Sequence, residues 1–237
     1  MRRLTDRDEL LDGPLDDTAV VRGNLHDLAR VNRRLGGTRL SIAAIGALAG
    51  GARRLDILDV GTGGADIPLA LLDHAGRVGS EWRVIGVDSR PEILAAAVAV
   101  EPRLTATAGL ILRVGDGTRL DQPDASVDVT HASLVVHHLA PDDVDALLRE
   151  MVRVARLGIV VNDLVRGRWS WIGAWLMSHL LTGNHFTRHD APMSVRRAYT
   201  VAELTALVAA AGFRVERRFD GPFGHRVALV ARRNGRS

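Results

Sequence analysis

Short apolar runs and longer stretches of helically spaced apolar residues alternate along this chain. The apolar runs predict strands at 55–60, 82–87, 110–114, 159–161, 213–219 and 225–232, and the segment 120–129 leads into a further strand, the fourth in the chain. Helically spaced apolar positions predict helices at 16–35, 40–48, 67–72, 91–100, 144–155 and 200–211. The chain is therefore expected to form an α/β fold, a doubly wound, mostly parallel seven-stranded sheet whose last strand runs antiparallel.

Two parts of the chain lie outside this alternation. Residues 1–50 precede the first strand and are expected to form an N-terminal helical cap, whose charged residues 1–15 are a loose arm. Residues 51–237 are expected to form the main domain. Within it, residues 164–199 make a connection longer than the sheet needs, which predicts a helical lid.

The segment Leu55–Asp66 combines an apolar strand, a turn containing Gly61, Gly63 and Gly64, and the start of an apolar helix. Glycines in such a turn let the backbone approach a ligand and leave the amides of the helix N-terminus pointing at it. A nucleotide-like cofactor is therefore expected. A dinucleotide fingerprint would need a small residue at Asp66, where a carboxylate repels a diphosphate.

Asp88 ends the second predicted strand, about 20 residues beyond the glycine turn. An acid at this spacing accepts hydrogen bonds from ribose hydroxyls. Because NAD enzymes and methyltransferases share this feature, Asp88 supports a nucleoside cofactor without choosing between the two classes.

The segment Asp59-x-Gly61-x-Gly63-x-Ala65 resembles the first motif of class I S-adenosylmethionine (SAM) methyltransferases, with Ala65 in place of the usual third glycine. Carboxylates near this turn suit SAM, which carries a sulfonium and an ammonium and has no phosphates. Segments 115–118 and 123–129 resemble motifs of the family that includes the ubiquinone and menaquinone C-methyltransferases. One departure is the turn before the fifth strand, Arg156-Leu157-Gly158, where such families usually carry Pro-Gly-Gly.

This resemblance implies a Rossmann-like methyltransferase fold with SAM as the cofactor. It also implies that Asp116 accepts a hydrogen bond from the adenine amino group and that Gly117 offers a backbone N–H to the ring. Asn32 and Arg33 are further candidates, for the methionine carboxylate of SAM. The predicted cofactor-binding residues are Asp59, Gly61, Thr62, Gly63, Gly64, Asp88, Ser89, Asp116, Gly117 and Ser133.

Methyl transfer to a phenol requires the phenol to lose a proton, which a histidine with an unperturbed pKa of about 6.5 can accept. His137 and His138 follow the fourth predicted strand, and the same pair is common in the quinone-methyltransferase relatives. His185 and His189 of the insertion are rival catalytic candidates. Those two also have the spacing of metal ligands, but the chain has no Cys and no third ligand is signalled, so no metal site is predicted.

The insertion 164–199 holds three of the four Trp residues and a cluster of His, Arg and Asp. We expect it to cover an apolar substrate and fix its polar end; the alternatives are a helical pair packed on the core and an interfacial membrane helix at 169–181. Together with Asn32–Gly37, it resembles bacterial methyltransferases linked to polyketide and phenolic-lipid pathways. The predicted substrate-binding residues are Trp175, His179, Phe186, Arg188 and Arg196.

Composition narrows these expectations. The chain has 237 residues, 46% of them apolar, enough for one sizeable domain. The absence of Cys excludes disulfides, thiolate zinc sites and thiol nucleophiles, and it fits a cytoplasmic protein. The longest apolar and glycine stretch, 42–52, is shorter than the about 20 residues of a membrane span, and the first residues lack the apolar core of a secretory signal.

All 31 basic residues are Arg, although the formal net charge is only +3. A C-terminal cluster of them suggests a phosphate-binding face, for which a solvated edge is the plainer interpretation. The cluster comprises Arg214, Arg217, Arg218, Arg226, Arg232, Arg233 and Arg236. Because aromatic residues make up only 4% of the chain and no stacking motif is visible, nucleic acid is a minor hypothesis.

The predicted function is SAM-dependent methyl transfer to a small apolar aromatic acceptor, which is a phenol, a quinone or a polyketide-derived ring of secondary metabolism. O-methylation is favoured over C-methylation. The alternatives are an RNA-binding protein or RNA methyltransferase that uses the Arg-rich C-terminal face, and a SAM-binding protein without catalysis. The identity of the acceptor and the oligomeric state stay open.

Overall fold

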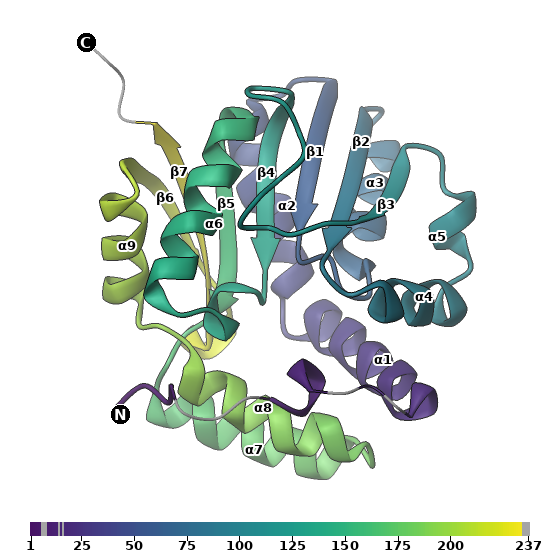
Figure 1. Cartoon of the computed structure of the whole chain (residues 1–237), viewed down its shortest axis with the longest axis vertical. Helices are drawn as coiled ribbons and strands as arrows, with labels where there is room; N and C mark the ends of the chain where they lie inside the picture. The colour runs from purple at the N-terminus through teal and green to yellow at the C-terminus, as the bar shows by residue number, and fades with distance from the viewer. Residues whose placement is uncertain (6–8, 14, 16, 234–237) are drawn as a thin grey trace.

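The computed structural model describes residues 1–5, 9–13, 15 and 17–233. In this part of the chain, seven strands form one sheet in the order β3-β2-β1-β4-β5-β7-β6, with helices on both faces (Figure 1). The strands are β1 (Arg54–Val60), β2 (Glu81–Asp88), β3 (Leu110–Val114), β4 (Val127–Ser133), β5 (Ala155–Leu164), β6 (Phe213–Asp220) and β7 (Arg226–Arg233). The α-helices are α1 (Thr18–Arg34), α2 (Gly37–Ala49), α3 (Asp66–Arg77), α4 (Pro91–Val100), α5 (Arg103–Ala106), α6 (Pro141–Val154), α7 (Arg168–Leu181), α8 (His185–Arg197) and α9 (Val201–Ala210). The short 3-10 helices are η1 (Leu10–Asp12), η2 (Val136–His138) and η3 (Pro222–Gly224).

The sheet has the predicted topology. Strands β1 to β5 run parallel, and β7 enters antiparallel between β5 and β6. The doubly wound, mostly parallel seven-stranded sheet is thus confirmed. Because Val60 pairs with Val87 of β2 and with Ala132 of β4, the carboxyl ends of these three strands lie level with one another. Ligands of such sheets bind beyond these ends.

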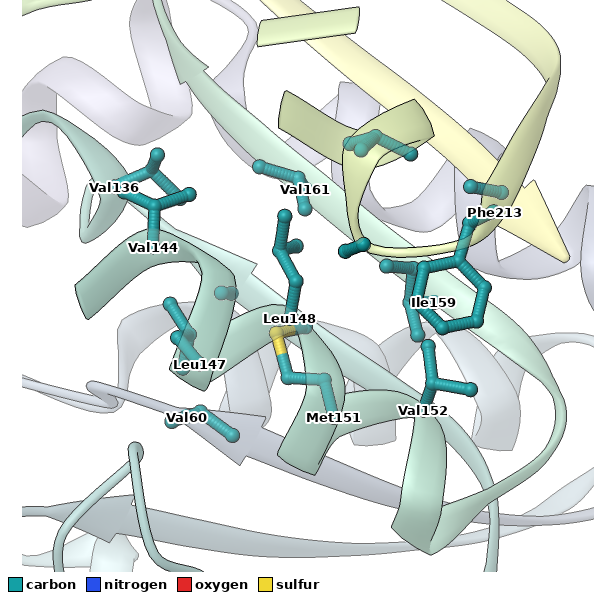
Figure 2. Packing of buried hydrophobic residues seen from close by; sticks show 14 of the residues in the cluster. Val60, Val136, Val144, Leu147, Leu148, Met151, Val152, Ile159, Val161 and Phe213 are labelled. Carbon is teal, nitrogen blue, oxygen red and sulfur yellow. The ribbon is translucent and has the colours of Figure 1, made fainter. Parts of the chain in front are cut away.

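Buried aliphatic side chains alternate between the two faces of the central strands. Leu58 of β1 faces the layer formed by α6 and α9, whereas Leu55 and Ile57 face α2 and α3. Figure 2 shows the first of these layers, with Leu148 and Met151 of α6 close to the side chains of the sheet. A one-residue slip would turn each of these side chains to the wrong face, so this packing fixes the strand register and the position of the strand ends.

Local signals set the starts of the helices that surround these strand ends. Asp17 caps α1 and Asn184 caps α8, because each side chain accepts hydrogen bonds from two backbone N–H groups of the first turn. Thr200 and Glu203 form the predicted capping box of α9. Pro91 stands in the first turn of α4, where its missing N–H costs nothing.

The described part of the N-terminal arm is held against the domain, so the prediction of a loose arm is wrong for it. The backbone N–H groups of Leu10 and Leu11 donate to the carboxylate of Asp190 on α8, at 2.8 and 3.1 Å. Glu9 is only 5% exposed. Among the described charged residues of this arm, Arg3, Glu9 and Asp12 thus contact α8 or the loop after β4.

The insertion forms a helix pair, α7 and α8, as predicted. Together with α1 and η1 this pair forms a layer beyond the carboxyl ends of β1 and β4 (Figure 1). Helix α8 contacts α1, η1 and η2, whereas α2 packs on β5 and β7 of the sheet. The division into an N-terminal cap and a main domain stays a prediction.

Candidate functional site

The glycine turn after β1 is open on one side and tightly packed on the other. Gly61 and Gly63 have φ values of +67° and +52°, which side chains rarely adopt. A Cβ atom at Gly61 would lie 2.4 Å from Cγ2 of Val135, whereas one at Gly63 would meet nothing within 4 Å. The backbone N–H of Thr62 donates to the carbonyl of Val87 (2.9 Å), which ties the turn to β2. The turn therefore presents its Gly63 side to open space.

Asp88, at the end of β2, holds this turn from the other side. Its Oδ2 accepts from the backbone N–H of Gly63 (2.8 Å) and its Oδ1 from that of Arg90 (3.0 Å). Burial raises the pKa of Asp88, and the two backbone hydrogen bonds oppose that shift. Ser89 beside it is exposed. Since each carboxylate oxygen accepts more than one hydrogen bond, Asp88 can also receive two ribose hydroxyls.

Asp116 and Gly117 form the turn after β3, at the same edge of the sheet. The Oδ1 atom of Asp116 accepts from the backbone N–H and the hydroxyl of Thr118, both at 2.8 Å. A Cβ atom at Gly117 would lie 2.6 Å from Cγ1 of Val60, so a glycine lets this turn approach β1 closely. The predicted adenine-binding pair therefore lies next to the strand that carries the glycine turn.

Two further carboxylates stand behind the turn. Asp59 is buried and accepts from the hydroxyl of Thr62 (2.7 Å) while its other oxygen lies 2.6 Å from Nδ1 of His131. Asp59 thus braces the turn from inside the protein. Asp66 at the start of α3 accepts from the side-chain amide of Asn32, and burial raises its pKa.

These features fit SAM better than a dinucleotide. The turn leaves open space at Gly63, and Asp59, Asp66 and Asp88 surround it with carboxylates. A positively charged sulfonium and ammonium are attracted by such a set, whereas the diphosphate of NAD is repelled. Asp88 would hold the ribose, Asp116 and Gly117 the adenine, and the Gly63 backbone the chain that bears the sulfonium.

Asp88→Asn is expected to weaken SAM binding by about 1.5–3 kcal/mol, the scale of hydrogen bonds to a charged group. Calorimetric titration of SAM into both proteins measures the change. Asp73→Asn is the matched control, because Asp73 is a half-exposed carboxylate of α3 that pairs with Arg103. An unchanged dissociation constant for the folded Asp88→Asn protein would contradict the assignment.

Arg226 of β7 organises a buried polar network that the sequence did not reveal. Its side chain is 2% exposed, and it donates to Oδ1 of Asn162 (2.7 Å), Oδ1 of Asn32 (2.6 Å) and Oγ of Ser133 (2.6 Å). Burial lowers the pKa of Arg226 to about 10, so it stays cationic at neutral pH. Asn32 and Ser133, which we predicted to touch the cofactor, are therefore tied to Arg226, while Arg33 is exposed.

The network continues from Arg226 back to the glycine turn. The Nδ2 atom of Asn162 donates to Oγ of Ser41 (2.7 Å), which lies 2.7 Å from Nε2 of His131. His131 in turn contacts Asp59, which holds Thr62. The one visible signal was His131, a histidine in the middle of strand β4. Arg226 offered no such signal, because it stands among many other Arg residues.

The C-terminal Arg cluster is not the uniform face that the sequence suggested. Arg226 is buried, so its assignment to a phosphate-binding face is wrong. Arg214 and Arg232 both pair with Glu216 (3.3 Å each), and Arg218 pairs with Asp220 (2.5 Å). The positive charge of Arg214, Arg218 and Arg232 is thus partly compensated by acids of β6, whereas Arg236 lies outside the described residues.

His137 forms a buried pair with Asp163 at the ends of β4 and β5. His137 is 2% exposed, and its Nδ1 lies 2.6 Å from Oδ1 of Asp163. The other carboxylate oxygen of Asp163, Oδ2, accepts from the backbone N–H of His137 (3.1 Å). Although burial alone raises the pKa of Asp163, the neighbouring His137 holds it below its usual range. The other ring nitrogen, Nε2, faces Oε1 of Glu9 at 3.8 Å. Asp163 was missed as a functional residue; its only signal was an acid that ends a strand.

His138 has a different environment. Its ring lies against that of His137, with centroids 4.2 Å apart, and its Nδ1 is 3.0 Å from Oδ1 of Asp12. Burial alone lowers the pKa of His138, but the carboxylates of Glu9 and Asp12 raise it to about 9. His138 is therefore an imidazolium at neutral pH.

The remaining predicted histidines stand apart from this pair. His185 and His189 are exposed on α8, where His185 packs edge-on against Phe186 and His189 contacts Asp190 (2.8 Å). The structure thus brings His137 and His138 together at the strand ends and leaves the other two on the helix surface.

The predicted substrate-binding residues lie on the helix pair. Trp175 stacks on His179 with ring centroids 4.6 Å apart. Arg188 donates to the carbonyl of Thr182 (2.8 Å), and Arg196 is exposed near the end of α8. Their contacts belong to the lid itself, so a role in binding substrate stays a prediction.

Comparison with known proteins agrees with this geometry. Residues 57–158 match the family model described as a methyltransferase domain. The fold resembles a SAM-dependent methyltransferase from Aquifex aeolicus, at 18% identity over 85% of this chain and 96% of that chain, with a TM-score of 0.57. It also resembles human N-acetylserotonin methyltransferase in complex with SAM (16% identity, 95% of this chain and 61% of that one, TM-score 0.67). Magnesium protoporphyrin IX methyltransferase from Synechocystis PCC 6803 with bound SAH is a further example (17% identity, 85% of both chains, TM-score 0.58).

Among curated proteins, none matches this chain. At the identities above, similarity to the solved structures supports the fold alone. The family model covers the part of the chain that carries the glycine turn, Asp88 and Asp116. The strand order, the open turn and its surrounding carboxylates agree with both. Residues 57–158 therefore carry a methyltransferase domain, and the chain has the fold of the SAM-dependent methyltransferases named above.

Proposed function

We propose that this methyltransferase acts on a hydroxyl oxygen of a small apolar aromatic acceptor, which is a phenol, a quinone-type ring or a polyketide-derived ring. The observation that carries the proposal is the buried His137–Asp163 pair at the ends of β4 and β5. Two structural neighbours are named for small acceptors, N-acetylserotonin and magnesium protoporphyrin IX, which supports an acceptor of this size class.

The pair has the geometry of an oriented base. Because Asp163 is a carboxylate, it accepts the Nδ1–H of His137 and leaves the lone pair on Nε2. A phenol that approaches Nε2 can pass its proton there as its oxygen becomes nucleophilic. SAM, when bound, supplies a methyl group on a sulfonium.

His138 and Glu9, the neighbours of His137, have different roles in this proposal. His138 is already cationic at neutral pH, so we assign proton transfer to His137 and the holding of the adjacent carboxylates to His138. Glu9 lies over Nε2, which means that Glu9 and η1 must shift to admit an acceptor. Once the acceptor is in place, the same segment would exclude water from the reacting atoms.

Transfer of tritium from methyl-labelled SAM to a panel of apolar phenols tests this function. Each phenol is paired with the same ring in which the hydroxyl is already methylated. We expect label only in the free phenols, and products whose new methyl group is on oxygen by NMR.

Two results would overturn parts of the proposal. Carbon-methylated products would refute O-methylation while keeping the acceptor class. Tight SAM binding with no transfer to any ring would instead favour a SAM-binding protein without catalysis.

A further inference from the structure

Helix α7 exposes almost its entire apolar surface. Trp169 is 83% exposed and Leu180 71%, and within the helix only Ser178 is buried. By contrast, α6, of the same length, buries six residues on the sheet. We call the exposed set the α7 face; it consists of Trp169, Ile172, Trp175, Leu176, Met177, Leu180 and Leu181. An exposed apolar patch of this kind marks an interaction site.

Four members of the α7 face form a stripe along the helix, and the other three flank it. Trp169, Ile172, Leu176 and Leu180 follow one another at intervals of three or four residues, the spacing of a single stripe. Among the described helices, none is long and apolar enough to cross a membrane. With 14 residues, α7 can lie along a surface and bury the stripe there.

The segment that bears the α7 face carries positive charge and no negative charge, and the nearest carboxylate of α1, Asp27, is buried and paired with Arg30. Between Asp163 and Asp190 the chain contains no acidic residue. Arg168 at the start of α7 is exposed and has no ion-pair partner among the residues that the structure describes. It also lines a hollow of about 470 Å³ together with Met1, Trp171 and Ile172. At the other end of the helix, Arg188 is exposed beside the carbonyl groups of His179 and Thr182.

The exposed apolar stripe and the unpaired positive charge beside it together indicate which partner fits the α7 face. In a two-fold contact, a second copy of the chain would bring the same acid-free segment against the α7 face, so Arg168 and Arg188 would gain no negative charge from it. Anionic lipid head groups supply that charge, and Trp and Arg are favoured where hydrocarbon meets head groups. The helix is also the outermost element beyond the strand ends, with α8 between it and the sheet (Figure 1).

We propose that the α7 face docks on the surface of an anionic lipid bilayer, with the helix lying in the interface. Docking there turns the layer that covers the strand ends towards the membrane, where an apolar acceptor would dissolve. The proposal does not depend on which acceptor is methylated or on turnover at all.

Sedimentation with vesicles tests it. The full chain is mixed with vesicles of phosphatidylcholine, with or without phosphatidylglycerol, at low and high salt. We expect binding to the phosphatidylglycerol vesicles that weakens with salt. The double variant Trp169→Ser/Leu180→Ser is expected to bind at least about tenfold more weakly, because two exposed apolar side chains lose their burial. Arg168→Ala is expected to weaken binding about fivefold.

The control removes apolar side chains elsewhere. Val78→Ser/Ile111→Ser changes two exposed apolar residues of α3's end and β3, and it is expected to bind like the unchanged protein. Retained SAM affinity shows that each variant is folded. Absence of binding to phosphatidylglycerol vesicles at low salt would overturn the proposal, as would equal losses in both double variants. Self-association that disappears only in Trp169→Ser/Leu180→Ser, without vesicle binding, would instead make the α7 face a contact between copies.

Discussion

His137→Ala is expected to lower kcat by roughly 10²–10⁴ while the affinity for SAM is kept. The side chain makes no hydrogen bond to the glycine turn or to Asp88, so cofactor binding should survive its removal. Turnover is measured with SAM saturating and with a phenol found by the labelling experiment. The acidic limb of the kcat–pH profile should disappear with the ring, because that limb reports protonation of the base.

Further variants distinguish a catalytic base from a residue that only holds the loop in place. Asp163→Asn keeps the shape of the pair but can donate to Nδ1, which favours the wrong tautomer, so it should also lose turnover by about 10² or more. His185→Ala and His189→Ala are the matched controls, since both residues are exposed on α8. Near-full turnover of His137→Ala would refute His137 as the base; if the two control variants also keep turnover, positioning of an already ionised or carbon-centred acceptor would explain the reaction.

The parts of the structure that could be predicted from the sequence are those determined by residues close together in the chain. The apolar runs predicted the strands, and the glycines at 61 and 63 predicted a turn, in which both residues have positive φ in the structure. The capping box of Thr200 and Glu203 fixed the start of α9. Each of these signals lies within a few residues of its effect, so the topology and the cofactor edge could be derived from sequence.

The parts that could not be predicted depend on residues far apart in the chain. Arg226 reaches Asn32 across 194 positions because β7 inserts beside β5 and α1 returns over the strand ends. Glu9 approaches His137 for a similar reason, since η1 crosses between α8 and the loop after β4. In a chain whose only basic residue besides His is Arg, nothing local distinguishes a buried guanidinium from a solvated one.

Replacing Arg226 by Met is expected to lower the free energy of unfolding by about 3–5 kcal/mol. Met fills much of the volume but donates no hydrogen bond. Asn162 and Asn32 would each keep a buried acceptor without its donor, at about 1–3 kcal/mol for each unsatisfied group, and the half-buried hydroxyl of Ser133 would also lose its donor. Arg226→Lys should recover only part of the loss, because one ammonium cannot match three acceptors placed around a planar fork.

Urea unfolding followed by circular dichroism measures these differences, with Arg218→Met as the matched control. Arg218 lies on the neighbouring strand β6, is half exposed and pairs with Asp220, so its loss should cost at most about 1 kcal/mol. The variant Gly37→Ala disturbs the same network without removing Arg226. Its Cβ atom would lie 2.3 Å from Nη1 of Arg226 and 2.9 Å from Oδ1 of Asn32. If Arg226→Met and Arg218→Met cost the same, the buried network does not stabilise the fold, and the strand ends must be held by apolar packing alone.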